Sequence, residues 1–153
     1  MSNRLIGAFS LSLAVVSSTA WAGDYKVESI EAFLVLGQSG KLSANLIVPT
    51  PPIDFWNTGI GEGGAGEWTS DLLVIGHFVR APEAGGTTAK ITVRDHDSGK
   101  VLYERKAADL TFAEGASAAK AFVVNDIQCT NLDVAMSIGG DSRTVNLPFA
   151  CGE

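Results

Sequence analysis

The triplet Asp95-His96-Asp97 brings two carboxylates and an imidazole together in three consecutive residues. Carboxylate oxygens and imidazole nitrogens bind divalent metals, so Asp95 and Asp97 form a candidate metal pair. The glycine and distant glutamate of a calcium-binding loop are missing from the pattern. Asp97-Ser98-Gly99 is also ordinary turn chemistry, because an aspartate bonds its own turn. We favour the turn without a metal, and we expect no cofactor.

A 23-residue segment from Pro49 to Asp71 holds the second group of candidate residues, among them two of the three tryptophans. A connection of this length inside a small domain is often functional. Aromatic rings beside hydrogen-bonding and acidic groups are typical of sugar and peptide sites. The alternative is that the aromatic side chains plug the open end of a β-sandwich. The candidate binding residues are Phe55, Trp56, Asn57, Glu62, Glu67 and Trp68.

Constellations typical of enzymes are missing from the sequence. His77 lies within a strand-like run, as core or subsurface histidines do. A chain with two histidines offers little for a multi-histidine metal centre. There is no Gly-x-Ser-x-Gly elbow. Glu62 and Glu67 could form a glycosidase pair, but the surrounding glycines would hold it poorly. We therefore predict a non-catalytic protein.

Cys129 and Cys151 are the two cysteines of the chain. In an exported protein two cysteines predict one disulfide, here closing a C-terminal hairpin. Closing a loop of this size stabilises a fold by about 3 kcal/mol. A catalytic thiol or a metal pair would need closer spacing.

The N-terminal residues predict export. Arg4 supplies a positive start, Leu5–Val16 is mostly apolar, and Ala20-Trp21-Ala22 is an A-x-A cleavage site. The apolar run is shorter than the roughly 20 residues that span a bilayer. We therefore expect residues 1–22 to be a cleaved signal peptide. Residues 23–153 would form one periplasmic or secreted domain, with no membrane insertion of the mature chain.

The net charge of the mature chain makes some classes of binding partner unfavourable. After Arg4 is removed, 10 basic and 17 acidic residues remain, a net charge near −7. A nucleic-acid-binding protein needs a basic surface, so we expect no nucleic-acid partner. The scattered acidic residues are typical of a solvated surface.

Alternation of apolar and polar residues through most of the mature chain predicts half-buried antiparallel strands. The first predicted hairpin joins Ile30–Leu36 to Leu42–Val48 and places Leu36 opposite Leu42. Its loop is Gln38-Ser39-Gly40, with the glycine in a left-handed conformation.

Two further hairpins and the segments between them are also predicted. A second hairpin joins Ala89–Asp95 to Lys100–Arg105 and sets Val93 opposite Tyr103. Leu72–Arg80 is apolar on both faces, which favours a central strand. Residues 122–124 predict another strand, and residues 109–121 suit either a short helix or a strand with a loop. The last hairpin pairs Val134 with Leu147 and Met136 with Val145, across a Gly140-Asp141 type II′ turn.

Eight or nine short strands with little helix predict an antiparallel β-sandwich of immunoglobulin-like or jelly-roll type, with a small barrel as the alternative. The leading functional hypothesis is a periplasmic binding or accessory module for an envelope or secreted protein or peptide. It would bind through the Pro49–Asp71 loop or through an exposed sheet edge. Alternatives are a carbohydrate-binding module that uses the loop tryptophans on a glycan, and a small hydrolase acting on envelope polymer.

Overall fold

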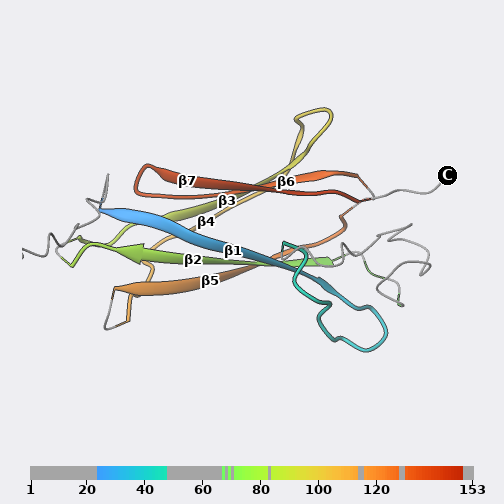
Figure 1. Cartoon of the computed structure of the whole chain (residues 1–153), viewed down its shortest axis with the longest axis horizontal. Coiled ribbons are helices and arrows are strands. Elements are labelled where there is room, and N and C mark those ends of the chain that lie inside the picture. Colours follow the sequence, from blue (N-terminus) through green and yellow to red (C-terminus); the bar gives the residue numbers. More distant parts are fainter. Residues whose placement is uncertain are drawn as a thin grey trace, which may run out of the picture.

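The computed structural model describes residues 24–47, 67, 69, 71–82, 84–113, 116–127 and 130–149. Seven strands form two antiparallel sheets that stack as two layers (Figure 1). The described ranges contain no helix, and so none that could cross a membrane. The strands are β1 (Tyr25–Val35), β2 (Asp71–Arg80), β3 (Ala89–Asp95), β4 (Val101–Ala107), β5 (Ser117–Val124), β6 (Leu132–Ile138) and β7 (Asp141–Leu147).

The strand order is β1-β2-β5 in one sheet and β4-β3-β6-β7 in the other. Sandwiches of the immunoglobulin constant type group strands one, two, five and four against three, six and seven. The present order differs from that arrangement in one respect, since β4 pairs with β3 in the opposite sheet. The β-sandwich prediction is confirmed. The structure describes seven strands, fewer than the eight or nine expected.

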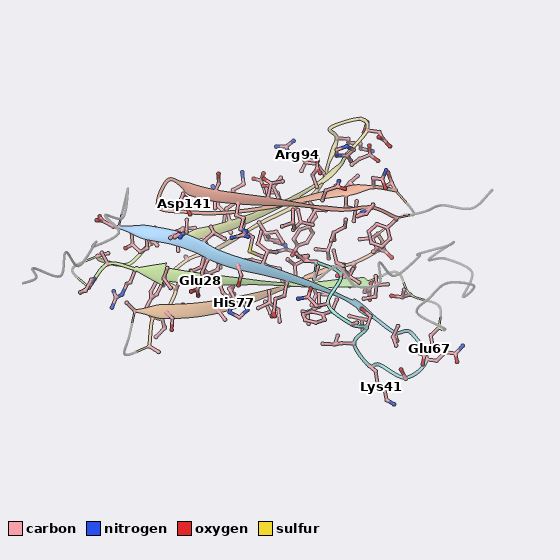
Figure 2. The ribbon with its side chains drawn as sticks, viewed as in Figure 1. Glu28, Lys41, Glu67, His77, Arg94 and Asp141 are labelled. Atoms are coloured by element: carbon pink, nitrogen blue, oxygen red, sulfur yellow. The ribbon has the colours of Figure 1, made fainter. Side chains whose placement is uncertain are left out.

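The core lies between the two sheets, whose strands alternate buried with exposed positions. Figure 2 shows side chains of both layers filling this space. Apolar area removed from water stabilises the fold by about 25 cal/mol per Å². The largest fully buried side chains are Phe78, Leu34, Leu72, Ile91, Leu132, Met136, Ile138, Leu147, Val74, Val93, Val134 and Thr69.

The first predicted hairpin is right in its loop and wrong in its second strand. Gly40 has the expected positive φ of 67°. However, Leu42 lies opposite Val35 rather than Leu36, and this single bridge is the only regular pairing of residues 42–47. The reason is that the side chains of Ser43 and Asn45 accept bonds from the N–H groups of Leu34 and Ala32, at 2.9 and 3.2 Å. Side-chain oxygens thus replace backbone carbonyls along the edge of β1.

Predictions for the middle of the chain are confirmed. The β3–β4 pairing sets Val93 opposite Tyr103, and Gly99 closes the loop with a φ of 69°. β2 is the central strand of its sheet, with β1 on one side and β5 on the other. Residues 117–124 form β5, and the described residues before it, 109–113 and 116, are neither helix nor strand, which agrees with the strand-and-loop alternative for residues 109–121.

The last hairpin is shifted by two residues from its predicted register. Val134 lies opposite Val145 and Ile138 opposite Asp141, so the turn is Gly139-Gly140. Both glycines have positive φ, 54° and 92°, which is the type I′ combination rather than the expected type II′. Ile138 is 1% exposed, and the observed register brings it into the core. A shift by two keeps every side chain on its face, which is why alternation alone did not exclude it.

Side chains also close the seam between β1 and β7. The Asp141 carboxylate accepts a bond from the Val27 N–H at 2.7 Å. The Arg143 guanidinium donates to the Glu28 carbonyl at 2.9 Å. In Figure 2 Asp141 lies on β7, in the layer beside β1. The N-terminal half of β1 is therefore tied to the opposite sheet.

Several predicted features lie outside the described residues. They are the signal peptide over residues 1–22, the candidate binding residues Phe55, Trp56, Asn57, Glu62 and Trp68, and both cysteines, Cys129 and Cys151. The cleavage, the loop site and the disulfide therefore stay predictions.

Candidate functional site

The Asp95-His96-Asp97 triplet lies where β3 passes into the hairpin loop. Both Asp95 carboxylate oxygens are used within the fold: Oδ1 accepts bonds from the Ser98 N–H and hydroxyl, each at 2.7 Å. Oδ2 accepts from the Thr130 hydroxyl at 2.5 Å. These bonds, the one from Thr130 first, lower the Asp95 pKa from 3.8 to about 2. The carboxylate therefore fastens the hairpin loop to the segment before β6.

His96 projects from the same loop onto β6. Its Nδ1–H donates to the Asp133 carboxylate, with both oxygens at 3.0 Å. The Asn146 amide on β7 donates to Asp133 Oδ1 at 2.9 Å. The Asn146 bond and then the His96 bond lower the Asp133 pKa. The Asp133 bond and charge, with smaller contributions from Asp97 and Asp95, raise the His96 pKa.

The described part of the chain contains no group of three His, Cys, Asp or Glu side chains that could hold a metal. Among the described residues, the hydrogen-bond partners of His77 and His96 include no serine, threonine or cysteine side chain. The hydrogen bonds within the polar cluster of Asp95, His96, Asp133 and Asn146 have a structural role. They join the β3–β4 loop to β6 and β7.

We expect a proton titration of His96 by NMR to give a midpoint above the usual 6.5, because Asp133 stabilises the imidazolium. A raised pKa in the folded state means that the His96–Asp133 pair stabilises the fold below pH 6.5. That contribution is lost as the pH rises through the raised value. Asp133→Asn should return the midpoint toward 6.5. A midpoint unchanged by this substitution would refute the pairing.

Glu67, one of the candidate binding residues, bonds the first hairpin loop. Its Oε2 accepts from the N–H groups of Ser39 and Gln38, at 2.9 and 3.2 Å. The Ser39 bond lowers the Glu67 pKa, and desolvation opposes this shift. Figure 2 shows Glu67 beside this loop, near Lys41. Its carboxylate therefore holds residues 37–41 in place.

The outer face of the β1-β2-β5 sheet is the feature that stands out chemically. Adjacent strands align Phe33 with Leu73 and Val123, and Ile75 with Ala121. These five residues, which we call the apolar face, alternate with the buried positions and point away from the core. Val123 is 47% exposed, and none of the five belongs to or packs against the core cluster.

Polar groups border this face on one side. His77 Nε2 lies 3.1 Å from Glu31 Oε2, and both side chains are more than a third exposed. His77 is two residues after Ile75 and therefore lies on the same face of β2. It lies opposite Ser29. The sequence predicted a core or subsurface histidine, and His77 instead lies on the outer face with its side chain 36% exposed. The apolar face thus ends at a hydrogen-bonding pair.

The outer face of the opposite sheet is mostly polar, although β4 exposes Val101 and Leu102, each 42% exposed. On β3, β6 and β7 its outward positions are polar with one exception, Ala135. They are Lys90, Thr92, Arg94, Asp133, Ala135, Ser137, Ser142, Thr144 and Asn146. Antiparallel sheets in sandwiches usually have this pattern of one apolar and one polar face. The β1-β2-β5 sheet departs from it, and exposed apolar patches mark interaction surfaces.

Comparisons with known proteins bear on the fold. No family model matches the chain, and no curated protein does. Among solved structures, the crystal structure of the C-terminal domain of wzt matches with a TM-score of 0.50 at 10% sequence identity. The match covers 86% of this chain and 75% of that one. The likeness is one of fold alone. It agrees with a β-sandwich built from two antiparallel sheets.

Two features of this arrangement were not predicted from the sequence. The His96–Asp133–Asn146 contacts depend on β3 pairing with β6, which leaves no local signal. The apolar face had a signal, the apolar run of β2 on both of its sides, which we took to mean burial on both faces. Within the described residues only the inner side is buried, and Leu73 and Ile75 are half-exposed.

Proposed function

We propose that this chain is an exported, non-catalytic β-sandwich of immunoglobulin-like type that binds an envelope or secreted protein or peptide. The observation that supports the proposal most is the apolar face of Phe33, Leu73, Ile75, Ala121 and Val123. Ala121 and Val123 are exposed there, and Phe33, Leu73 and Ile75 are half-buried. Burying one Leu or Ile side chain fully is worth about 1.5–3 kcal/mol. We place the proposed binding surface on this sheet face, whereas the sequence suggested the Pro49–Asp71 loop or an exposed sheet edge.

Charge and bonding agree with a non-catalytic role. The described carboxylates with lowered pKa values are held in structural contacts: Asp95 in its turn, Glu67 at the 37–41 loop, Asp133 against His96, and Glu104 on Lys90. Functional acids and bases are usually poised in a cleft with a raised or matched pKa. The apolar face offers contact area and a hydrogen-bonding border instead.

The experiment compares two doubly charged variants. Leu73→Lys/Ile75→Lys places two ammonium groups on the apolar face of central strand β2. Ala135→Lys/Ser137→Lys places them, at the same spacing, on the outer face of β6 in the opposite sheet. Each protein is checked by circular dichroism and then used to capture partners from envelope extract. We expect the first variant to capture at least tenfold less partner than the unchanged protein, because its lysines must be desolvated in the interface. Equal capture by both variants would refute the proposal.

Export and the disulfide belong to the same proposal, because both suit a protein that works in the envelope. They are tested by intact mass spectrometry of protein recovered from the periplasm of an exporting host. We expect a chain that begins at Gly23 and whose Cys129 and Cys151 do not react with iodoacetamide unless reductant is added. Retention of residues 1–22, or two reactive thiols, would contradict this part of the proposal.

A further inference from the structure

We propose that the free edge of β5 takes an added strand from an extended peptide whose apolar side chains extend the apolar face. This inference names the binding mode for the proposed function and rests on it. It concerns the backbone of β5, whereas the proposed function concerns the side chains of the sheet face.

The hydrogen-bond pattern tells which groups of β5 point outward. Arg80 N–H donates to the Ala116 carbonyl at 2.9 Å, so that opposed pair is a hydrogen-bonded one. Bonded and non-bonded pairs alternate along an antiparallel ladder. Even-numbered residues of β5 therefore bond β2, and Ala119, Ala121 and Val123 direct their N–H and C=O groups away from it. The odd-numbered Ser117 follows the same pattern. Its carbonyl points away from β2 and accepts a hydrogen bond from the Ala113 N–H at 2.9 Å.

The other sheet edges within the described residues are either covered by neighbouring segments or carry charged side chains. The edge of β1 is occupied by residues 42–47 and by Asp141, and β7 lies along the seam with β1. On β4 the exposed side chains are Val101 and Leu102 together with three charged ones, Glu104, Arg105 and Lys106. Charged side chains on an edge strand oppose pairing with another chain. β5 carries one charge, Lys120, among alanines, phenylalanine and valines.

The occupant is an extended peptide rather than a second copy of this chain. A stable interface between two folded copies buries about 1,200–2,000 Å² in all. Three outward-facing residues on an eight-residue strand offer much less, whereas an extended segment needs only the edge and the face beside it. The net charge of the mature chain, near −7, also opposes association of two copies.

The side chains of β5 specify the peptide further. Residues that pair with Ala119, Ala121 and Val123 place their side chains on the outer face, next to Ile75 and Leu73. Small alanines at this edge favour large apolar partners there. The residue opposite Lys120 points to the other side, and an acidic residue there gains an attractive cross-strand pair. The expected ligand alternates large apolar side chains with polar ones, one of them acidic.

The test uses a blocked eight-residue peptide with valine at alternate positions, and threonines and one glutamate between them. One derivative is N-methylated on its valines, whose N–H groups face β5, and the other on its threonines. Both keep every side chain. We expect the unmodified and threonine-methylated peptides to bind and to slow hydrogen exchange of the Ala119, Ala121 and Val123 amides at least tenfold. The valine-methylated peptide should not bind.

Two variants of the protein, rather than of the peptide, test the same edge. Ala121→Pro removes an outward N–H without breaking a bond to β2, and edge strands tolerate such a proline. Thr144→Pro is the control on β7, at the edge of the other sheet. We expect Ala121→Pro to weaken peptide binding at least tenfold and Thr144→Pro to leave it unchanged. If Ala121→Pro does not fold, binding of the two methylated peptides to the unchanged protein still tests the inference.

Three results would overturn the inference: no binding of the unmodified peptide, equal binding of the two methylated peptides, or protection of the β5 amides by a dimer without peptide. Loss of the envelope partner by Leu73→Lys/Ile75→Lys but not by Ala121→Pro would also overturn it. That last result would leave the apolar face as the binding surface. Retention of the partner by both variants would refute the proposed function as well.

Discussion

Gly76→Ala should lower the free energy of unfolding by about 3 kcal/mol, as overpacking of a filled core does. Gly76 is buried on the inner side of β2, and a Cβ there would overlap Met136 Sδ and lie 2.7 Å from Phe78 Cζ. Met136 and Phe78 are both fully buried, so neither can move aside without disturbing the core. Urea unfolding monitored by circular dichroism measures the loss.

The controls for Gly76→Ala separate the clash from the change of residue type. Gly85→Ala adds the same methyl group in open space and should leave stability nearly unchanged. Met136→Ala alone should cost about 2–5 kcal/mol. Combined with Gly76→Ala it should cost less than the sum of the two, because the truncated side chain makes room. A Gly76→Ala protein as stable as the parent would show that β2 does not pack against β6 as described.

Gly139→Ala should be the second large effect, a loss of about 2–4 kcal/mol in the free energy of unfolding. Gly139 has a φ of 54°, where a side chain is strained, and a Cβ there would overlap the Tyr25 ring and lie 2.9 Å from its Cγ. The loss therefore has two causes, the backbone and the packing of β1 against the β6–β7 turn.

Gly140→Ala separates these two causes. Gly140 has a φ of 92° but nothing within 4 Å of a Cβ, so only the backbone strain of about 1–2 kcal/mol applies. Tyr25→Ala should relieve part of the Gly139→Ala loss and none of the Gly140→Ala loss. Equal losses at the two glycines would argue that Tyr25 does not cover the turn. If neither substitution has an effect, the turn is not Gly139-Gly140.

The hairpin around residues 96–99 shows what local chemistry can predict. Asp95, Ser98 and Gly99 make the bonds and the positive φ of the loop among themselves, so the register of β3 with β4 follows from a few residues. The prediction was right there because nothing distant was needed. The same holds for the left-handed Gly40.

Residues 42–47 show where alternation misleads. Leu42, Ala44 and Leu46 have the spacing of a strand, yet the side chains of Ser43 and Asn45 accept the bonds from β1 N–H groups. The N–H groups of Ser43 and Leu46 still donate to β1 carbonyls. Alternation reports which side chains face the core, and it does not report which atoms complete the hydrogen bonds. Competition between polar side chains and the backbone decided this edge.

Pairing between distant strands could not be predicted. β1 pairs with β2 and β2 with β5, across intervals that leave no mark on neighbouring residues. The apolar face exists only through this pairing, because it brings Phe33, Leu73 and Val123 into one row. For the same reason the His96–Asp133 contact became visible only in the folded chain.

Site-specific photo-crosslinking tests the central claim, that the apolar face is the binding surface, most directly. A photoreactive amino acid replaces Leu73 on the apolar face or Ala135 on the outer face of the opposite sheet, two half-buried outward positions on central strands. The protein is exported, illuminated in the intact envelope and recovered under denaturing conditions. We predict a discrete crosslinked partner from position 73 and none from position 135. Crosslinks of equal yield from the two positions, or a partner found at position 135 alone, would contradict the claim.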